Sequence, residues 1–460
     1  MPGREHRTTH ERVAGQVTPE NAQPPTPADP ARPADPAPPA DSAPPADSRQ
    51  PADSRQPADP ALRAGSRWSR AGRPALPGLI SLLAALAFAL ARWQTWAHGN
   101  IGRFILVGRH FSVPSQVPRG IPIMPTYGYD GQFFYRLALN PVNLSHTAYG
   151  ITVDRSYRYM RIGYPVVTWV VSLGQHALVP VMLVAVNVAA IGALGYLGGM
   201  FAQAAGRHAL AGLLLPAYFG LLTSLSRDTA EPLAAVFLLG GLLAVRSRRP
   251  VLAAILLAFS VLTRETVMVA VAAIAIVRIV AVLRRRQPPR PGRDDLPWAV
   301  PAVVFVAWQA VVKAATGSIP LLADGGRNAG APFIAPWQAL TSNLHHVDTH
   351  QLDQYDVWLL ELAVLVLFSL AALASMWSTN APVHERLAFV LYLVEICVVT
   401  PSTWGSLDAD LRSFIEVYLL AVIIVLGTPR RFPTARALPW LSVLLIPALT
   451  AVAQRRFTGS

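Results

Sequence analysis

Long apolar stretches separated by short polar segments dominate the chain from residue 76 onward. A helix crosses the hydrocarbon core of a bilayer with about 20 apolar residues, because its backbone then satisfies all of its own hydrogen bonds. The stretches near this length are 76–91, 176–202, 208–224, 231–246, 250–264, 266–283, 297–314, 356–376, 387–401, 413–427 and 437–453. The pattern therefore predicts an all-α fold, a polytopic transmembrane bundle of about eleven helices. The apolar piece 164–173 is too short to span, and we expect an interfacial or re-entrant helix there.

The first 73 residues follow a different pattern, polar and rich in Pro, Ala and Asp, with Pro-Ala-Asp-Ser-Arg-Gln repeated over 45–60. Such a segment has too few large apolar side chains to offset the entropy lost on ordering. We therefore expect a disordered cytoplasmic tail over 1–73 and a transmembrane domain over 74–455. The first 30 residues lack an apolar core, so no secretory signal peptide is expected.

The basic residues predict an orientation. Arg63, Arg67, Arg70 and Arg73 precede the first apolar stretch, and the positive-inside rule places its N-terminus in the cytoplasm. In that topology all five inside loops carry Arg or His. We therefore expect a multi-pass plasma-membrane protein with extracytoplasmic loops at 97–163, 315–355 and 402–413. The C-terminal Arg455-Arg456 falls outside on this count, so the number of helices is approximate.

Composition supports lipid as the main partner. Only 14% of residues are charged and the mean hydropathy is +0.37, whereas a soluble domain carries about 25% charged residues. The net charge of +13 is typical of nucleic-acid binders, but the Arg residues form short clusters between apolar stretches, and no base-stacking platform interrupts them. We expect a lipid-bilayer partner and no nucleic acid. Cys397, the single Cys, excludes a disulfide framework.

Polar residues crowd the first external loop around Tyr129-Asp130-Gly131-Gln132. A carboxylate framed by glycine and aromatic residues suits an exposed turn, and the nearby aromatic planes can stack on a sugar or form a membrane-interface belt. An Asp before an apolar-periodic segment equally suits a helix N-cap. Both alternatives stay open for this loop. The candidate functional residues of this loop are Asp130 and, for substrate binding, Tyr129, Gln132, Arg136, Arg158 and Arg161.

Two short turns, Arg227-Asp228 and Arg264-Glu265, place ionisable residues at helix junctions. Charges there are costly unless they are paired or hydrated. A salt bridge within each turn is the simpler interpretation. The functional interpretation is that a guanidinium group presents its planar fork to a phosphate. All four residues are candidates for substrate binding.

The last external loop contains Asp408 and Asp410, which are candidate ligands for a divalent cation that bridges phosphates. Arg412 is a further candidate for substrate binding. Arg412 and Glu416 are spaced i, i+4 and would share one helix face. The histidines of the 315–355 loop are more typical of an exposed loop than of a metal site.

Three segments carry a resemblance: Tyr-Asp-Gly-Gln-Phe-Phe-Tyr-Arg-Leu-Ala at 129–138, Arg-Ile-Gly-Tyr-Pro at 161–165 and Leu-Thr-Arg-Glu-Thr at 262–266. The chain resembles the GT-C superfamily of membrane glycosyltransferases, especially the mannosyltransferase-like branch, and integral membrane proteins of GC-rich bacteria. The resemblance spans about 75–430 in architecture but only about 30 residues in motif. It implies transfer of a sugar from a polyprenyl-phosphate donor to an extracytoplasmic glycan, lipid or protein acceptor. Asp130 would be the general base.

The chain departs from that superfamily in two ways, since the first loop lacks a paired acidic motif and no large soluble C-terminal domain follows. Arg227 and Arg264 are chosen by position, as cations that offset charge on the leaving phosphate. A transporter or flippase of lipid-linked sugars or other envelope precursors is the alternative, with a polysaccharide polymerase or ligase chemically close to the enzyme. Transporters tend to show internal repeats and charges near the membrane midplane. Here the ionisable residues lie at helix ends on one predicted side, which favours an external cavity.

Overall fold

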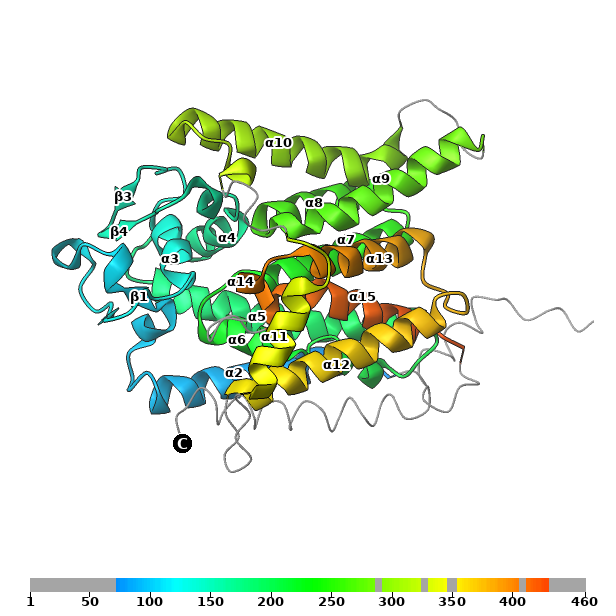
Figure 1. Cartoon of the computed structure of the whole chain (residues 1–460), viewed down its shortest axis with the longest axis horizontal. Helices are drawn as coiled ribbons and strands as arrows, with labels where there is room; N and C mark the ends of the chain where they lie inside the picture. Colours follow the sequence, from blue (N-terminus) through cyan, green and yellow to red (C-terminus); the bar gives the residue numbers. More distant parts are fainter. Residues whose placement is uncertain (1–71, 286–291, 324–329, 346–353, 405–410, 430–460) are drawn as a thin grey trace, which may run out of the picture. The chain divides into compact units, whose positions relative to one another are not determined.

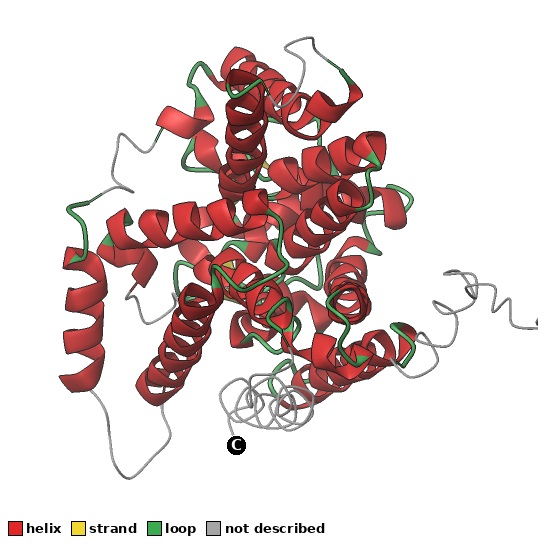
Figure 2. Ribbon diagram, turned by 90° about the vertical axis from the view of Figure 1, so that its right-hand side faces the viewer, coloured by secondary structure: helices red, strands yellow, loops and turns green. Residues whose placement is uncertain are grey.

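The computed structural model describes residues 72–285, 292–323, 330–345, 354–404 and 411–429 (Figure 1). All of them belong to one compact unit. These residues form fourteen α-helices, short 3-10 turns and two small two-stranded sheets. Figure 2 shows how helices dominate the described part. The predicted all-α class is therefore confirmed. The predicted tail, 1–73, lies almost wholly outside the described residues.

Five of the described helices are long and apolar enough to cross a membrane. All five coincide with predicted stretches. Together they make the chain a multi-pass membrane protein. They are α2 (Ala75–Thr95), α5 (Val179–Ala204), α9 (Met268–Leu283, preceded by the turn η6, Glu265–Val267), α10 (Leu296–Thr316, preceded by η7, Arg293–Asp295) and α12 (Gln354–Ser375).

Four further predicted stretches form helices that are shorter than a span. They are α7 (Glu231–Arg246), α8 (Pro250–Thr263), α13 (Val383–Val398) and α15 (Ile415–Leu426). At about 1.5 Å per residue they are only about 18–24 Å long. The full-length spans among the described residues are thus fewer than the eleven predicted. The last predicted stretch, 437–453, lies outside the described residues.

The predicted single helix over 208–224 is wrong. The chain forms η5 (Ala209–Leu214), breaks at Pro216 and resumes as α6 (Phe219–Ser226). Proline has no N–H to donate to the preceding turn. Gly212 also packs directly on the backbone of α5, where an added Cβ would lie 2.1 Å from the carbonyl carbon of Gly198. Close backbone packing and the proline together explain the break.

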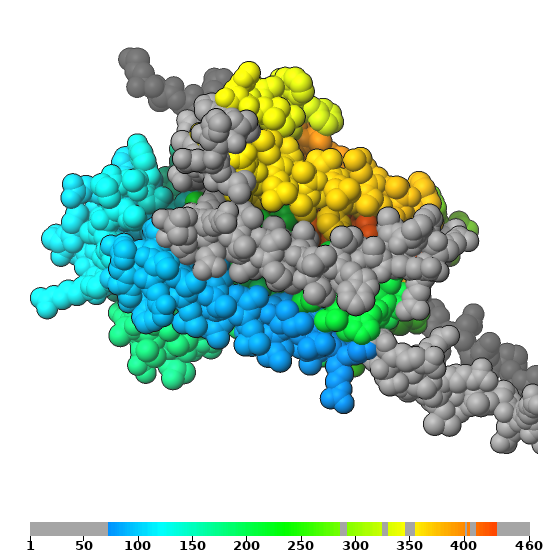
Figure 3. Space-filling model, turned by 90° about the horizontal axis from the view of Figure 1, so that it is seen from below, coloured from blue at the N-terminus to red at the C-terminus, as the bar shows by residue number. Residues whose placement is uncertain are grey.

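The helices pack in adjacent pairs, α2 with α5, α7 with α8, α8 with α10, α9 with α13 and α12 with α15 (Figure 1). The short helix α15 is buried along nearly its whole length, and its side chains belong to the main core cluster. Seen from below, α2 in blue and α12 in yellow form much of the visible surface (Figure 3). Because α15 is enclosed by protein, its first turn can hold a charged residue away from lipid.

The first loop, 97–163, folds onto the helices, and its buried residues, which include Ile105, Phe134 and Ile151, share one core cluster with residues of α5, α7 and α10. Within this loop β1 pairs with β2 in parallel, Val107 opposite Ile123, and β3 pairs with β4 antiparallel. Helix α4, nine residues long, matches the predicted short helix at 164–173. The elements are η1 (Ile101–Ile105), β1 (Val107–Gly108), η2 (Arg109–Phe111), η3 (Pro114–Gln116), β2 (Ile123–Met124), α3 (Gly131–Leu139), β3 (Thr147–Ala148), β4 (Ile151–Thr152), η4 (Ser156–Tyr159) and α4 (Gly163–Val171).

The two later loops that were predicted to be external also contain short elements that the sequence did not predict. The 315–355 loop includes η8 (Pro320–Leu322) and α11 (Ile334–His345). The 402–413 region includes part of α14 (Pro401–Trp404) and most of η9 (Leu411–Phe414). Because η9 leads directly into α15, it fixes where Arg412 lies.

Candidate active site

Asp130 lies immediately before α3, in the N-cap position, yet its side chain makes no capping hydrogen bond. The carboxylate instead accepts hydrogen bonds from Arg158 Nη1 at 2.9 Å and from Arg412 Nη2 at 3.2 Å. The capping alternative is therefore wrong for this side chain. The Asp130 side chain is 35% exposed, so two guanidinium groups hold the carboxylate while part of it stays accessible.

Arg412 uses each of its three nitrogens on a different partner. Nη2 donates to Asp130, Nη1 donates to Glu231, and Nε donates to the Tyr129 hydroxyl at 3.0 Å. Glu231 is itself buried at the start of α7 and accepts a second hydrogen bond from Ser224 Oγ at 3.1 Å. The planar guanidinium fork suits such multiple contacts, which a lysine ammonium cannot reproduce. Arg412 thus connects the first loop to α7.

Tyr129 provides an aromatic surface for two cations. The guanidinium carbon of Arg227 lies 4.3 Å from its ring centroid and that of Arg412 lies 4.9 Å from the same ring. Both distances are within cation–π range. Arg227, at the end of α6, is only partly buried. The sequence-predicted residues Tyr129, Asp130, Arg227 and Arg412 therefore meet at one place.

The Arg264-Glu265 turn does not form the internal salt bridge that was the simpler prediction. Arg161 binds Glu265 with two hydrogen bonds, 2.8 and 2.6 Å long. Arg264 lies 3.3 Å from a carboxylate oxygen of Glu416 and donates to the Ser413 carbonyl at 2.7 Å. Each member of the turn thus pairs with a distant segment. Arg412 lies in η9 and Glu416 in α15, so the two do not share one helix face as predicted.

Asp228 lies apart from these pairs. It is fully buried in a left-handed conformation (φ 49°), and neither carboxylate oxygen has a hydrogen-bond partner in the described part of the chain. Burial raises the pKa of Asp228 well above its ordinary value, with Arg92 opposing the shift. A carboxyl in such surroundings takes up a proton rather than remain charged. It has no exposed surface to offer a substrate, and its predicted role stays a prediction.

Gln132 and Arg136 are buried to about 1% exposure and contact other parts of the first loop. The Gln132 side chain accepts from Gly108 N–H and donates to the Tyr127 carbonyl, both at 3.1 Å. Arg136 donates to the Ser145 carbonyl. These contacts position the loop, whereas the substrate-binding roles predicted for both residues have no direct support in the geometry.

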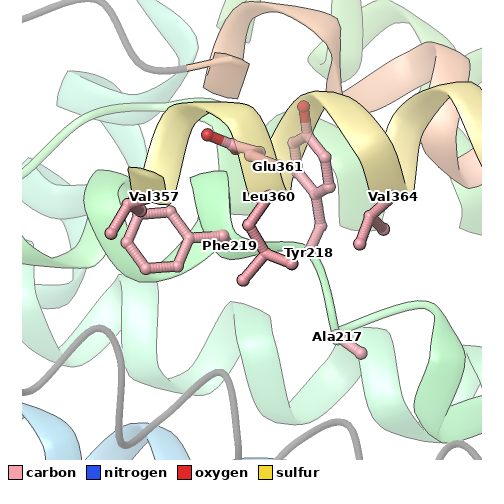
Figure 4. A pocket seen from close by; sticks show the side chains of 7 residues that line it. All are labelled: Ala217, Tyr218, Phe219, Val357, Leu360, Glu361 and Val364. Atoms are coloured by element: carbon pink, nitrogen blue, oxygen red, sulfur yellow. The ribbon is translucent and has the colours of Figure 1, made fainter. Parts of the chain in front are cut away.

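Arg412 is also attached to the span α12 through its neighbour Leu411. The Leu411 N–H donates to Glu361 Oε2 at 3.2 Å, and the Tyr218 hydroxyl donates to the Leu411 carbonyl. Figure 4 shows Glu361 on α12 beside the ring of Tyr218 and above that of Phe219. The cavity there has a volume of only about 10 Å³, at the lower limit for one water molecule. The side chains around this cavity pack tightly, and the space between them is too small for a ligand.

The metal prediction falls outside the structure, because Asp408 and Asp410 lie outside the described residues. Within the described ranges, no group of three or more His, Cys, Asp or Glu side chains is arranged to hold a metal ion. The divalent cation therefore stays a prediction.

Two acidic residues that sequence analysis did not select, Glu231 and Glu416, prove to be the partners of selected arginines. Their position within a turn of a helix start was the available signal.

The electrostatics of Asp130 favour the ionised form. Burial opposes ionisation, but the guanidinium groups of Arg412, Arg158 and Arg161 together hold the pKa of Asp130 below its ordinary value. The same pairing raises the pKa of Arg158, in spite of its own burial. At neutral pH the site therefore holds a carboxylate anion between cations.

We expect the stability difference between wild type and Asp130→Asn to report this lowered pKa. The ion pairs stabilise the folded protein at neutral pH, and their contribution is lost only as pH falls through the lowered folded-state pKa. The difference in melting temperature in detergent should be constant from about pH 7 to about pH 5 and shrink below about pH 4. A difference that vanishes between about pH 6 and 5 would mean that the pKa is raised.

Five candidate spans and a charge cluster at the ends of α3, α6, α7 and α8 define a multi-pass helical membrane protein with a polar site at one end of its bundle. No protein-family model matches the chain, and a search of curated proteins found no significant relative. The class is therefore carried by the helices and the site alone.

Proposed function

We propose that this protein is a membrane glycosyltransferase that moves a sugar from a polyprenyl-phosphate donor to an extracytoplasmic acceptor. The observation that carries the proposal is the partly exposed Asp130 carboxylate, which Arg158 and Arg412 bind directly. An anionic base surrounded by cations suits a reaction in which a hydroxyl loses a proton while a phosphate leaves. The resemblance of residues 129–138 to the GT-C superfamily points to the same chemistry.

In the proposed reaction an acceptor hydroxyl donates a hydrogen bond to Asp130. Its oxygen bonds to the anomeric carbon of the donor while the bond from that carbon to the phosphate oxygen breaks. The bonding electron pair leaves with the lipid phosphate, and the proton passes to Asp130. The attacking hydroxyl becomes acidic only as the new bond forms, so a carboxylate with a lowered pKa is basic enough to accept the proton.

Arg227 suits the role of phosphate ligand better than Arg264. Arg227 is partly exposed and lies over the Tyr129 ring, beside the Asp130 pairs. Arg264 is only 3% exposed and is engaged with Glu416 and the Ser413 carbonyl. A cation that already neutralises a buried carboxylate has less charge to offer a ligand.

The proposal includes a GT-C-like architecture of about eleven helices, a cytoplasmic N-terminus and an extracytoplasmic position of the site.

A transfer assay tests the proposal. Membranes containing the protein are supplied with radiolabelled polyprenyl-phosphate sugars, and label that reaches envelope acceptors is counted. Asp130→Asn should lower transfer by about 10²-fold or more, because the amide cannot accept the proton. Arg119→Ala, a change at an exposed position of the same loop, should transfer at the wild-type rate. Equal transfer by Asp130→Asn would exclude Asp130 as the base, and movement of donor across the bilayer without transfer would favour the flippase alternative.

A further inference from the structure

An exposed group of aromatic rings lies beside the Asp130 pairs and is not used by the proposed transfer step. Tyr127 is 66% exposed, and its ring centroid lies 4.4 Å from that of His110 and 6.3 Å from that of Phe111. We call these three rings the aromatic platform. Although His110 and Phe111 pack beside Tyr127, most of the Tyr127 ring surface remains open.

Arg158 connects the aromatic platform to Asp130. Its guanidinium carbon lies 5.5 Å from the Phe111 ring centroid and 3.8 Å from that of Phe133. The same guanidinium donates to Asp130 at 2.9 Å and to Asp154 at 2.5 Å. One guanidinium group therefore connects Phe111, at one side of the platform, to two partly exposed carboxylates.

The platform is held rigidly with respect to Asp130. The Tyr127 carbonyl accepts from Gln132, which belongs to the same turn of α3 as Asp130. Gly108 and Gly128 let the two chain segments touch, since a Cβ on Gly108 would lie 2.1 Å from the Tyr127 carbonyl carbon. Gly128 also has a φ of 72°, which favours glycine. A rigid support lowers the entropy cost of binding.

We propose that the aromatic platform is a subsite for a neutral sugar ring of the acceptor, and this inference rests on the proposed function. A sugar ring offers an apolar C–H face and a rim of hydroxyl groups. The apolar C–H face can stack on the open face of Tyr127, and the hydroxyl groups can donate hydrogen bonds to the carboxylates of Asp130 and Asp154. Arg155, Arg158 and Arg412 pair with the two carboxylates, so a neutral sugar can bind here without bringing a charge that needs a partner.

Binding measurements on the purified full-length protein test the subsite without any transfer. The probes are linear oligosaccharides of glucose, mannose, galactose and arabinose, titrated calorimetrically. We expect at least one probe to bind, and Tyr127→Ala to weaken that binding about tenfold through loss of ring contact. Tyr127→Phe should bind like wild type. Val142→Ala, at an 87% exposed position of the same loop, is the matched control.

The outcomes separate the subsite from the transfer reaction. Asp130→Asn should lose transfer and bind the oligosaccharide more weakly than wild type, because an amide replaces one charged acceptor of the sugar hydroxyls while the Tyr127 ring contact remains. Binding of a sugar without any transfer activity would leave the subsite standing and remove the proposed function. The subsite is overturned if none of the probes binds, or if Tyr127→Ala binds as well as wild type. If Tyr127→Ala binds sugar like wild type but a smaller fraction of it stays incorporated in lipid nanodiscs, the Tyr127 ring belongs to a membrane-interface belt.

Discussion

Replacing Arg412 by alanine is expected to destabilise the protein by about 3–5 kcal/mol, the cost of leaving a buried charge without its partner. Glu231, 2% exposed, would lose its guanidinium partner and keep the hydrogen bond from the Ser224 hydroxyl. Asp130 would keep its hydrogen bond from Arg158. Thermal unfolding in detergent measures the loss.

Two further variants identify the cause of this effect. Arg412→Lys should lose part of the stability, because an ammonium keeps the charge but not the three-way fork. Adding Glu231→Gln to Arg412→Ala should restore much of it, since the uncompensated carboxylate is then removed. If Arg412→Ala unfolds no more easily than Arg119→Ala, the buried network contributes little and its arrangement is not what holds the site.

Gly131→Ala is expected to produce the second large effect. An added Cβ would lie 2.4 Å from the carbonyl oxygen of Arg227 and 2.8 Å from that of Ile105. Both obstacles are backbone atoms, so α3 must move away from α6 and η1. Such overpacking costs about 3 kcal/mol. The shift would also carry Asp130 away from Arg412, so we expect sugar transfer to be lost along with the stability.

Gly292→Ala is the matched control for this change. Gly292 has no atom within 4 Å of an added Cβ, and its φ of −151° is accessible to any residue. Melting temperatures of the two variants should therefore differ by several degrees. A Gly131→Ala protein that melts and transfers like wild type would show that the α3–α6 contact is loose.

The sequence predicts the positions of most of the described apolar helices and which charged residues stand at their ends, because both depend on local pattern. The ends of α6, α7 and α8 lie near the predicted helix junctions. Asp130, Arg158, Arg227 and Arg412 were selected together, and the structure brings them together. The hydropathy pattern shows which residues lie at helix ends. Helix ends on the same side of a bundle lie close together in space.

The pairing within the cluster could not be predicted, because it depends on how separate segments pack. Arg264 and Glu265 are adjacent, and a salt bridge within the turn was the natural expectation. Instead Glu265 pairs with Arg161 and Arg264 with Glu416. The number of full-length spans among the described residues was also overestimated, since a short apolar stretch that is enclosed by protein, such as α15, resembles one that faces lipid.

The hydrogen bond between Asp130 and Arg412 joins residues 282 positions apart. At about 5–20 residues per second, synthesis delivers Arg412 on the order of 15–60 s after Asp130. During that interval Arg158 is the nearer partner in sequence, 28 residues from Asp130. The Arg158 pair can therefore form within the first loop alone, whereas the Arg412 pair must wait until the segment that carries η9 has been synthesised.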